Sequence, residues 1–230
     1  ALGWAWWRFD SLYRIELGDA QAASSGGAVN YLLVGSDSRA GITEDTPNAG
    51  VIGPGVTGRR SDTIIVLRLE GGKATMMSIP RDLWATNPAT GKAGRIHHYL
   101  EVDFVSFSGM VDAMGGITVR FDHPAIDRNS GLNIISDGPV QLDGTQALAY
   151  VRSRHYVEVV DGQQVPDPTA DLGRQERQQT FIRTVLSEVG ETRNPWTLLR
   201  VVGAAADGMR VDDQLGFGDV ISLARNLSGA

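Results

Sequence analysis

The stretch DTIIVLRLEGGKATMMSI, residues 62–79, decides the fold that we expect for this chain. A run of β-branched and other apolar residues comes first, Gly71 and Gly72 follow, and a second apolar run continues to Ile79. Two short apolar runs joined by a pair of glycines predict an antiparallel β-hairpin. We therefore expect the chain to be organised around a β-sheet.

Other patterns on both sides of this hairpin predict further strands and several helices. A buried strand is expected at 29–34, and Asp143 is suited to cap a helix that runs through Tyr150. Further expected elements are a strand at 117–121, helices at 102–114, 171–189, 195 onward and 215–227, and loops at 40–60 and 157–169. Because strands and helices are interspersed and one hairpin is antiparallel, we predict a single α/β domain with a mixed central sheet flanked by helices.

Composition excludes several classes of function. The chain has 230 residues, a formal net charge of −6 and no cysteine, with a pI near 5.2. A net acidic balance argues against a general nucleic-acid binder. The lack of cysteine excludes thiol catalysis, iron–sulfur clusters, zinc fingers and disulfides.

Three common functional motifs are either absent from the sequence or stand in the wrong context. Residues 53–58 match G-x-G-x-x-G, but a loop precedes them and a strand follows, whereas a dinucleotide site needs a strand before and a helix after. The four histidines form no H-E-x-x-H zinc motif, and no G-x-S-x-G nucleophile elbow is present.

Arginines and aspartates instead gather where the expected elements begin or end. The set comprises Asp37, Arg39, Arg60, Asp62, Arg81, Asp82, Arg152 and Arg154, together with Arg174 and Gln178, which are four apart on the long helix. If residues 151–155 are extended, Arg152 and Arg154 point to one side. Arginine binds phosphate through planar bidentate contacts, and Mg²⁺ bridges carboxylates and phosphates. The set predicts a magnesium–pyrophosphate site; ordinary solvated charge pairs are the alternative.

The chain resembles the LytR–CpsA–Psr family of cell-wall phosphotransferases over about residues 29–190. The matching stretches occur in family order and are 31–39 (YLLVGSDSR), 60–66 (RSDTIIV), 78–82 (SIPRD), 99–104 (YLEVDF), 111–117 (VDAMGGI), 142–154 (LDGTQALAYVRSR) and 171–179 (DLGRQERQQ). One departure is a shorter stretch between Asp82 and Tyr99 than the family pattern has. A second is a longer, Gly-rich stretch between Asp37 and Asp62.

The resemblance implies an extracytoplasmic enzyme that transfers a glycopolymer, arabinogalactan being one candidate, from a polyprenyl-pyrophosphate carrier to a peptidoglycan hydroxyl. By position, Asp37 and Asp62 match the family's Mg²⁺ (or Mn²⁺) ligands. The pyrophosphate-binding positions are Arg60, Arg81, Arg152, Arg154, Arg174 and Gln178, and the catalytic candidates are Arg81, Asp82, Arg152 and Asp62. The apolar faces of 102–114 and 181–189 are candidate walls for the lipid, with core packing as the alternative. A non-catalytic polyprenyl-phosphate-binding protein and a polyprenyl pyrophosphatase remain alternatives.

The first residues predict contact with a membrane. Trp4, Trp6 and Trp7 stand close together, and tryptophan favours the membrane–water boundary. Residues 19–28 are small and polar, as in a linker. We expect residues 1–28 to form a juxtamembrane helix and linker, anchored by an upstream membrane span, before a catalytic domain of residues 29–230. A short core-packing helix is the alternative.

Overall fold

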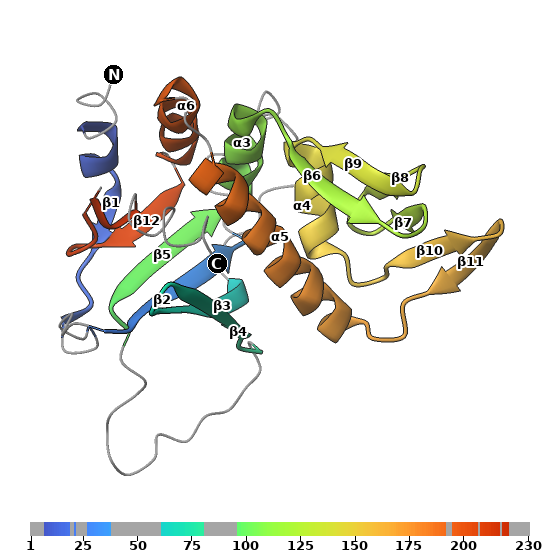
Figure 1. The fold of residues 1–230 in the computed structure, drawn as a ribbon, viewed down its shortest axis with the longest axis horizontal. Helices are drawn as coiled ribbons and strands as arrows, with labels where there is room; N and C mark the ends of the chain where they lie inside the picture. Colours follow the sequence, from blue (N-terminus) through green and yellow to red (C-terminus); the bar gives the residue numbers. More distant parts are fainter. Residues whose placement is uncertain are drawn as a thin grey trace, which may run out of the picture.

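A computed structural model describes most of the chain (Figure 1). The described residues are 7–18, 21, 27–37, 61–80, 96–191, 195–206, 208–216 and 218–220. Of the expected elements, the loop at 40–60 and most of the helix at 215–227 lie outside these residues.

A six-stranded mixed sheet forms the centre of the fold, in the order β1-β12-β5-β2-β3-β4. Its strands are β1 (Tyr13–Ile15), β2 (Val29–Ser36), β3 (Ser61–Glu70), β4 (Lys73–Ser78), β5 (His98–Asp103) and β12 (Met209–Asp212). β2 pairs in parallel with β5 and antiparallel with β3. The predicted mixed sheet and the 62–79 hairpin are therefore confirmed.

The helices whose bounds the described residues give are packed against the sheet or beside it (Figure 1). They are α3 (Phe104–Met114), α4 (Gly144–Arg152), α5 (Asp171–Glu191) and α6 (Pro195–Ala205). The Asp143 carboxylate accepts the backbone N–H of Gln146 at 2.8 Å, so the predicted cap of α4 is confirmed. α5 runs between the central sheet and the remaining strands, and Gln179 donates to Ser78 on β4 at 2.8 Å.

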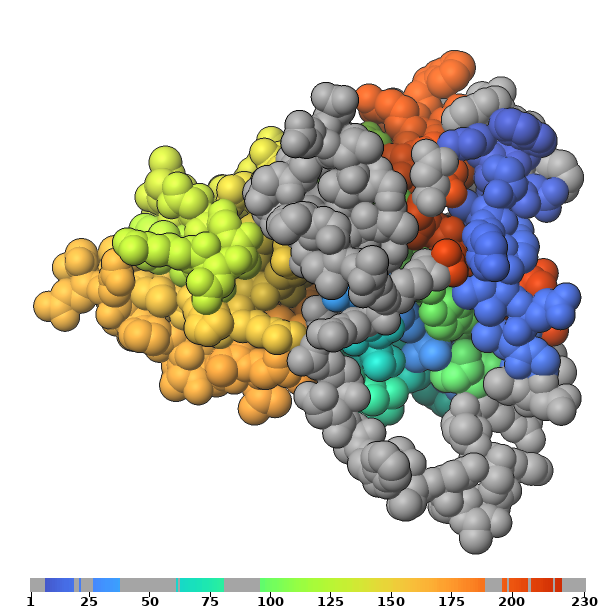
Figure 2. Space-filling model, turned by 180° about the vertical axis from the view of Figure 1, so that it is seen from behind, coloured from blue at the N-terminus to red at the C-terminus, as the bar shows by residue number. Residues whose placement is uncertain are grey.

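Two small sheets lie beyond α5. Their strands are β6 (Ile117–Phe121), β7 (Ala125–Asp127), β8 (Leu132–Ile134), β9 (Gly138–Leu142), β10 (Val157–Val160) and β11 (Gln163–Pro166), arranged as β6-β9 and β11-β10-β7-β8. Seen from behind, these strands project at one end of the molecule, and residues 7–18 lie at the other (Figure 2). The strand expected at 117–121 is confirmed.

Two of the expected boundaries are wrong. Residues 157–169 were expected as a loop, but they contain the hairpin β10–β11, whose second strand is exposed at every position and so has no apolar alternation to indicate it. The helix expected from residue 102 begins at Phe104, because Val102 and Asp103 complete β5. The Asp103 carboxylate accepts the Ser106 N–H at 2.8 Å and caps α3.

The core continues through α5 into the small sheets. Phe181 is 1% exposed, and its ring centroid lies 5.3 Å from that of Phe107 on α3. Phe181 packs in one cluster with Val111, Ile117 and Leu142. Its ring is therefore part of the core, and it is not a surface on which a lipid could lie.

The N-terminal residues share the sheet of the domain. β1 pairs in parallel with β12, and Phe9 and Leu12 are buried in one cluster with Tyr31 and Val211. The boundary that we expected between residues 28 and 29 therefore divides parts of one folded unit. Over the described residues, the chain has no helix with both the length and the apolar content that a bilayer crossing requires.

Candidate functional site

The strand order brings two of the predicted positions, Asp37 and Asp62, to one edge of the central sheet. β2 and β5 are parallel, so their carboxyl ends meet there, and β3 begins at the same edge because it is antiparallel to β2. Ser36 pairs with Ser61 on one side and with Asp103 on the other. Asp37 directly follows β2 and Asp62 is the second residue of β3, so the backbone positions of this predicted pair are neighbours.

Gln178 connects this edge to the helices. Its Nε2 donates to the Thr63 hydroxyl on β3 at 2.9 Å and to the Val151 carbonyl on α4 at 3.0 Å. The side chain is buried. Gln178 therefore holds α5, β3 and α4 together, and its amide nitrogen would have to release one of these partners to donate to a phosphate.

Two of the predicted arginines meet at one carboxylate. Arg174 lies one turn before Gln178, and its Nε and Nη2 lie 3.0 and 2.7 Å from Asp171 Oδ1. The Nε of Arg154 lies 3.8 Å from the same oxygen. Arg174 is almost fully buried, while Arg154 and Asp171 are open to solvent. The convergence of Arg154 and Arg174 that the sequence predicted is present.

Asp171 belongs to the site although sequence reasoning did not select it. Burial raises the pKa of its carboxyl, but the hydrogen bond from Gln175 and the charges and contacts of Arg174 and Arg154 outweigh burial and keep that pKa below its ordinary value. An ionised Asp171 offsets the repulsion between the two guanidinium groups. Its spacing of three residues from Arg174 on a helix was the available signal.

Arg152 takes a third position, on the last turn of α4. Its guanidinium carbon lies 4.6 Å from the ring centroid of Phe104, in cation–π contact with the first residue of α3. An extended conformation over residues 151–155 would have placed Arg152 and Arg154 on one side, but α4 continues through Arg152. The two arginines are therefore oriented by a helix end and by the turn after it, and strand alternation plays no part.

The turn after α4 is fixed by a buried carboxylate, that of Asp127 at the end of β7. Its Oδ2 accepts the Ser153 hydroxyl at 2.7 Å, the Arg154 N–H at 3.1 Å and the His155 N–H at 2.9 Å. The residue is 2% exposed. Burial raises the pKa of Asp127, but the hydrogen bonds, led by that of Ser153, outweigh burial and lower it.

Arg177, on α5, also binds the turn after α4. Its Nη2 donates to the Ser153 carbonyl at 2.9 Å, its Nη1 lies 2.9 Å from Asp167 Oδ2, and its guanidinium carbon lies 4.5 Å from the Tyr156 ring centroid. We call residues 152–156 the arginine segment. Asp127 and Arg177 both bind it, and sequence reasoning identified neither, because the partners are distant in the chain.

The remaining predicted residues cannot be placed. Arg60, Arg81, Asp82 and the side chain of Asp62 lie outside the described part of the chain. Among the residues that are described, no three His, Asp or Glu side chains gather into a metal site. One or two carboxylates are enough for Mg²⁺ when phosphates supply other ligands, so the positions of Asp37 and Asp62 at adjacent strands suit such an ion.

The sequence and the fold are both similar to those of known proteins. The chain is 31% identical over 235 residues to "Probable cell wall biosynthesis protein LcpB" of Corynebacterium glutamicum, covering 90% of this chain and 54% of that protein. It is 27% identical to a polyisoprenyl-teichoic acid–peptidoglycan teichoic acid transferase, TagU, of Enterococcus faecalis, covering 74% of this chain and 60% of that protein. The chain thus spans only about half to three-fifths of the length of these curated relatives.

Among solved structures, a LytR-Csp2A-Psr enzyme from Actinomyces oris superposes with a TM-score of 0.70. The two are 26% identical, and the match covers 94% of this chain and 82% of the other. The model of the LytR_cpsA_psr family matches residues 14–96 and 94–230. These two matches cover nearly the whole sequence, and the chain therefore belongs to the LytR_cpsA_psr family.

Proposed function

We propose that this chain transfers a glycopolymer from a polyprenyl-pyrophosphate carrier to a hydroxyl of peptidoglycan and leaves a phosphodiester link. The observation that carries the proposal is the meeting of Arg154 and Arg174 at Asp171, beside the end of α4 that bears Arg152. Arginine stays charged and binds phosphate oxygens in pairs. A group of arginines at the edge of an acidic protein suits a diphosphate headgroup, and the names of the relatives support a transferase of this kind.

In the proposed reaction, the acceptor oxygen forms a bond to the phosphorus that carries the glycopolymer. The bond from that phosphorus to the bridging oxygen breaks, and polyprenyl phosphate leaves with the electron pair. The hydroxyl proton passes to water or to a carboxylate, for which Asp37, Asp62 and Asp82 are the candidates. Arginines would stabilise the charge on the transferring group, where one well-placed guanidinium can contribute about 10³–10⁵ in rate.

We further assign Asp37 and Asp62 as the ligands of Mg²⁺ (or Mn²⁺). They follow and open neighbouring strands of the sheet, and carboxylate oxygens are the ligands that such ions prefer. The ion would offset the negative charge of the two phosphates when bound. Chelation by EDTA should then remove transfer, and added Mg²⁺ should restore it.

We place the reaction at the outer face of the cytoplasmic membrane. The polyprenyl carrier is a membrane lipid and the acceptor lies in the cell wall, so both substrates meet only there. An N-terminal anchor would keep the site beside its lipid substrate.

Substitution of the arginines tests the proposal. In an assay with lipid-linked donor and peptidoglycan acceptor, we expect Arg152→Ala and Arg174→Ala each to lower kcat at least a hundredfold, because each removes a charge from the transition state. Arg68→Ala is the matched control, since Arg68 lies at the far end of β3, paired with Glu70 on the surface. It should keep full activity.

Three results would contradict the proposal. Near-normal turnover in both arginine variants would show that Arg152 and Arg174 do not stabilise the transition state. Binding of the lipid-linked donor without product would indicate a binding protein. Release of phosphate from the donor with no acceptor present would indicate a pyrophosphatase.

A further inference from the structure

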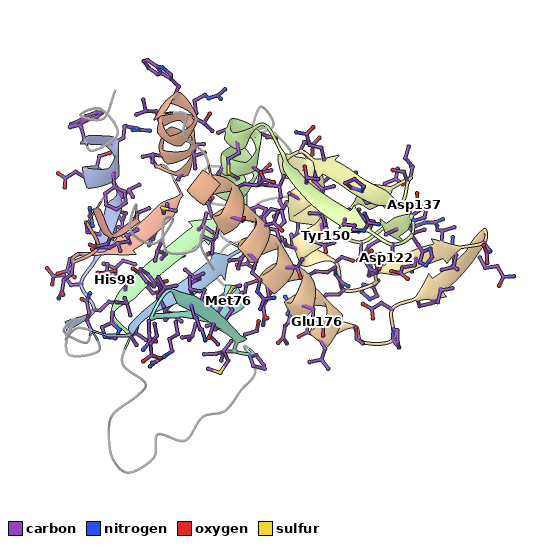
Figure 3. All side chains as sticks on the ribbon, viewed as in Figure 1. Met76, His98, Asp122, Asp137, Tyr150 and Glu176 are labelled. Atoms are coloured by element: carbon purple, nitrogen blue, oxygen red, sulfur yellow. The ribbon has the colours of Figure 1, made fainter. Side chains whose placement is uncertain are left out.

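A pocket of about 480 Å³ lies on the other side of the arginine segment, between α5 and the hairpin β10–β11. Tyr150, Asp122 and Glu176 on its walls are labelled in Figure 3. On α5 it is lined by Gly173, Glu176, Arg177 and Thr180, which share one face of the helix, whereas Arg174 and Gln178 occupy the next face. Its volume lies within the range of about 300–1,000 Å³ that is usual for small-molecule sites. We call it the tyrosine pocket.

Tyr150 and Tyr156 give the tyrosine pocket its aromatic walls. Tyr150 is buried and Tyr156 is half-buried, and within the described part of the chain no hydrogen bond to either hydroxyl is present. The Tyr156 ring is held in place by the guanidinium of Arg177. Two rings whose hydroxyls have no partner among the described residues suit a ligand that offers both an apolar face and polar groups.

Four carboxylates contribute to the polar wall. Asp122, Glu158, Asp167 and Glu176 line the pocket, and its one arginine, Arg177, is already bound to Asp167 and to the Ser153 carbonyl. Such a wall repels a phosphate, so the pocket is not an extension of the site for the diphosphate. Ionised carboxylates only accept hydrogen bonds, so they select a ligand that donates them.

The placement of these carboxylates also argues against a metal ion. They come from four separate elements: the residue after β6, β10, the residue after β11, and α5. All four are described, and the described residues contain no group of three His, Asp or Glu close enough to hold a metal. Acceptors spread around an aromatic pocket match the spaced hydroxyls of a sugar ring, whose C–H face can lie on a tyrosine.

The tyrosine pocket and the arginine site share a wall. Tyr156 is two residues after Arg154, the Asp167 N–H donates to the Tyr156 carbonyl at 2.8 Å, and Arg177 spans from the pocket to Ser153. We propose that the tyrosine pocket is a carbohydrate subsite, which holds an uncharged sugar beside the arginine segment. This inference rests on the proposed function for the source of that sugar: either the acceptor glycan of peptidoglycan or the glycopolymer of the donor.

The test uses Glu158→Gln/Glu176→Gln and Tyr156→Phe, which remove acceptors or a hydroxyl and keep the shape of the wall. The matched control is Asp137→Asn, an exposed carboxylate before β9 that does not line the pocket (Figure 3). The first probe is a peptidoglycan disaccharide freed of its stem peptide and with its lactyl carboxylate blocked as an amide, so that it is uncharged. Binding is followed by NMR chemical shifts on the labelled protein. If the pocket takes the acceptor, the double variant and Tyr156→Phe each weaken this binding about tenfold and raise the acceptor KM by the same factor. In that case the donor KM is unchanged.

If the pocket takes the donor's sugar, the same variants raise the donor KM about tenfold and leave disaccharide binding and the acceptor KM unchanged. The proposal is overturned if both KM values and disaccharide binding stay at the level of the Asp137→Asn control. It is also overturned if the variants weaken binding of the free stem peptide alone, since the pocket would then serve an ammonium group. Disaccharide binding does not require turnover. If the protein shows no transferase activity, the proposed function is refuted, but the binding experiment still tests the tyrosine pocket.

Discussion

At Asp127, one carboxylate holds the backbone that presents Arg154. All five of its hydrogen-bond partners are donors: Ser153, Arg154 and His155 at Oδ2, and Asn129 and Ser130 at Oδ1. An asparagine has the same shape, but its NH₂ group would replace one of the two oxygens. That group would then face N–H or O–H donors, with which it cannot form hydrogen bonds as an acceptor. The charge and the acceptor capacity of both oxygens are therefore required.

We predict that Asp127→Asn lowers the free energy of unfolding by about 1–3 kcal/mol, because buried donors lose their acceptor. It should also reduce kcat for transfer, since the arginine segment loses its fixed backbone. Urea titration and the transfer assay measure the two effects. Asp161→Asn is the control: Asp161 is exposed at the β10–β11 turn with φ 52°, a conformation that asparagine also adopts readily. Equal stability of the two variants would show that the Asp127 network contributes nothing.

Residues of this kind could not be identified from the sequence alone. Asp127 acts on Ser153 and His155, which are 26 and 28 positions away, and nothing in a linear pattern shows that pairing. Arg154 and Arg174 were selected because arginines at element ends suggest phosphate binding. Both contact Asp171, and their binding of phosphate stays a prediction. The sequence did not show that α4 continues through Arg152.

Among the elements, α3 and α4 approach most closely at Gly144. Its N–H donates to the Asp112 carboxylate at 2.7 Å, and a Cβ at this position would overlap the carbonyl oxygen and the hydroxyl of Ser108. α4 carries Arg152 at its far end, so the contact at Gly144 helps to fix where that arginine lies.

We predict that Gly144→Ala destabilises the protein by about 1–3 kcal/mol, as overpacking of a tight contact does. Gly109→Ala on α3 is the matched control, because its Cβ would meet Ala204 Cβ at an ordinary 3.6 Å. This control should be neutral or up to about 1 kcal/mol more stable, since alanine is the better helix former. Thermal unfolding of both variants decides the matter, and a Gly144→Ala variant as stable as the control would contradict the packing described.

The sequence predicted those elements whose residues are buried in a regular pattern. β2, β3 and β4 are such cases, as are α4 and α5 with their capping and helical spacing. β5 was missed because its last residues run into the helical spacing of α3. β10 and β11 pair with each other at the surface, where no apolar pattern is needed.

Over the whole molecule, aspartates form acid-sensitive connections between distant parts. Asp212 is fully buried, and it accepts from Gln21 at 2.7 Å and from the Tyr99 N–H at 2.9 Å. Burial raises its pKa, but the hydrogen bonds, led by that of His98, outweigh burial and lower it. The pKa values of Asp127, Asp167 and Asp171 are lowered as well.

A carboxyl whose pKa is lower in the folded than in the unfolded protein stabilises the fold above the unfolded pKa of about 3.9. That stability is lost as the pH falls through the lower, folded value. We therefore predict that the free energy of unfolding declines steeply below about pH 4, and that Asp212→Asn makes this decline shallower. Urea titrations at several pH values measure the slope, and parallel slopes in the two proteins would contradict the role of Asp212.

The parallel pairing of Tyr13–Ile15 with Arg210–Asp212 has a consequence for how the molecule is made. A strand close to the start of the chain can find its neighbour only after about two hundred further residues have been synthesised. During synthesis, residues 13–15 therefore remain unpaired while the other strands assemble. The sheet is completed only when the C-terminal part arrives, so a chain truncated before residue 209 would leave this strand without a partner.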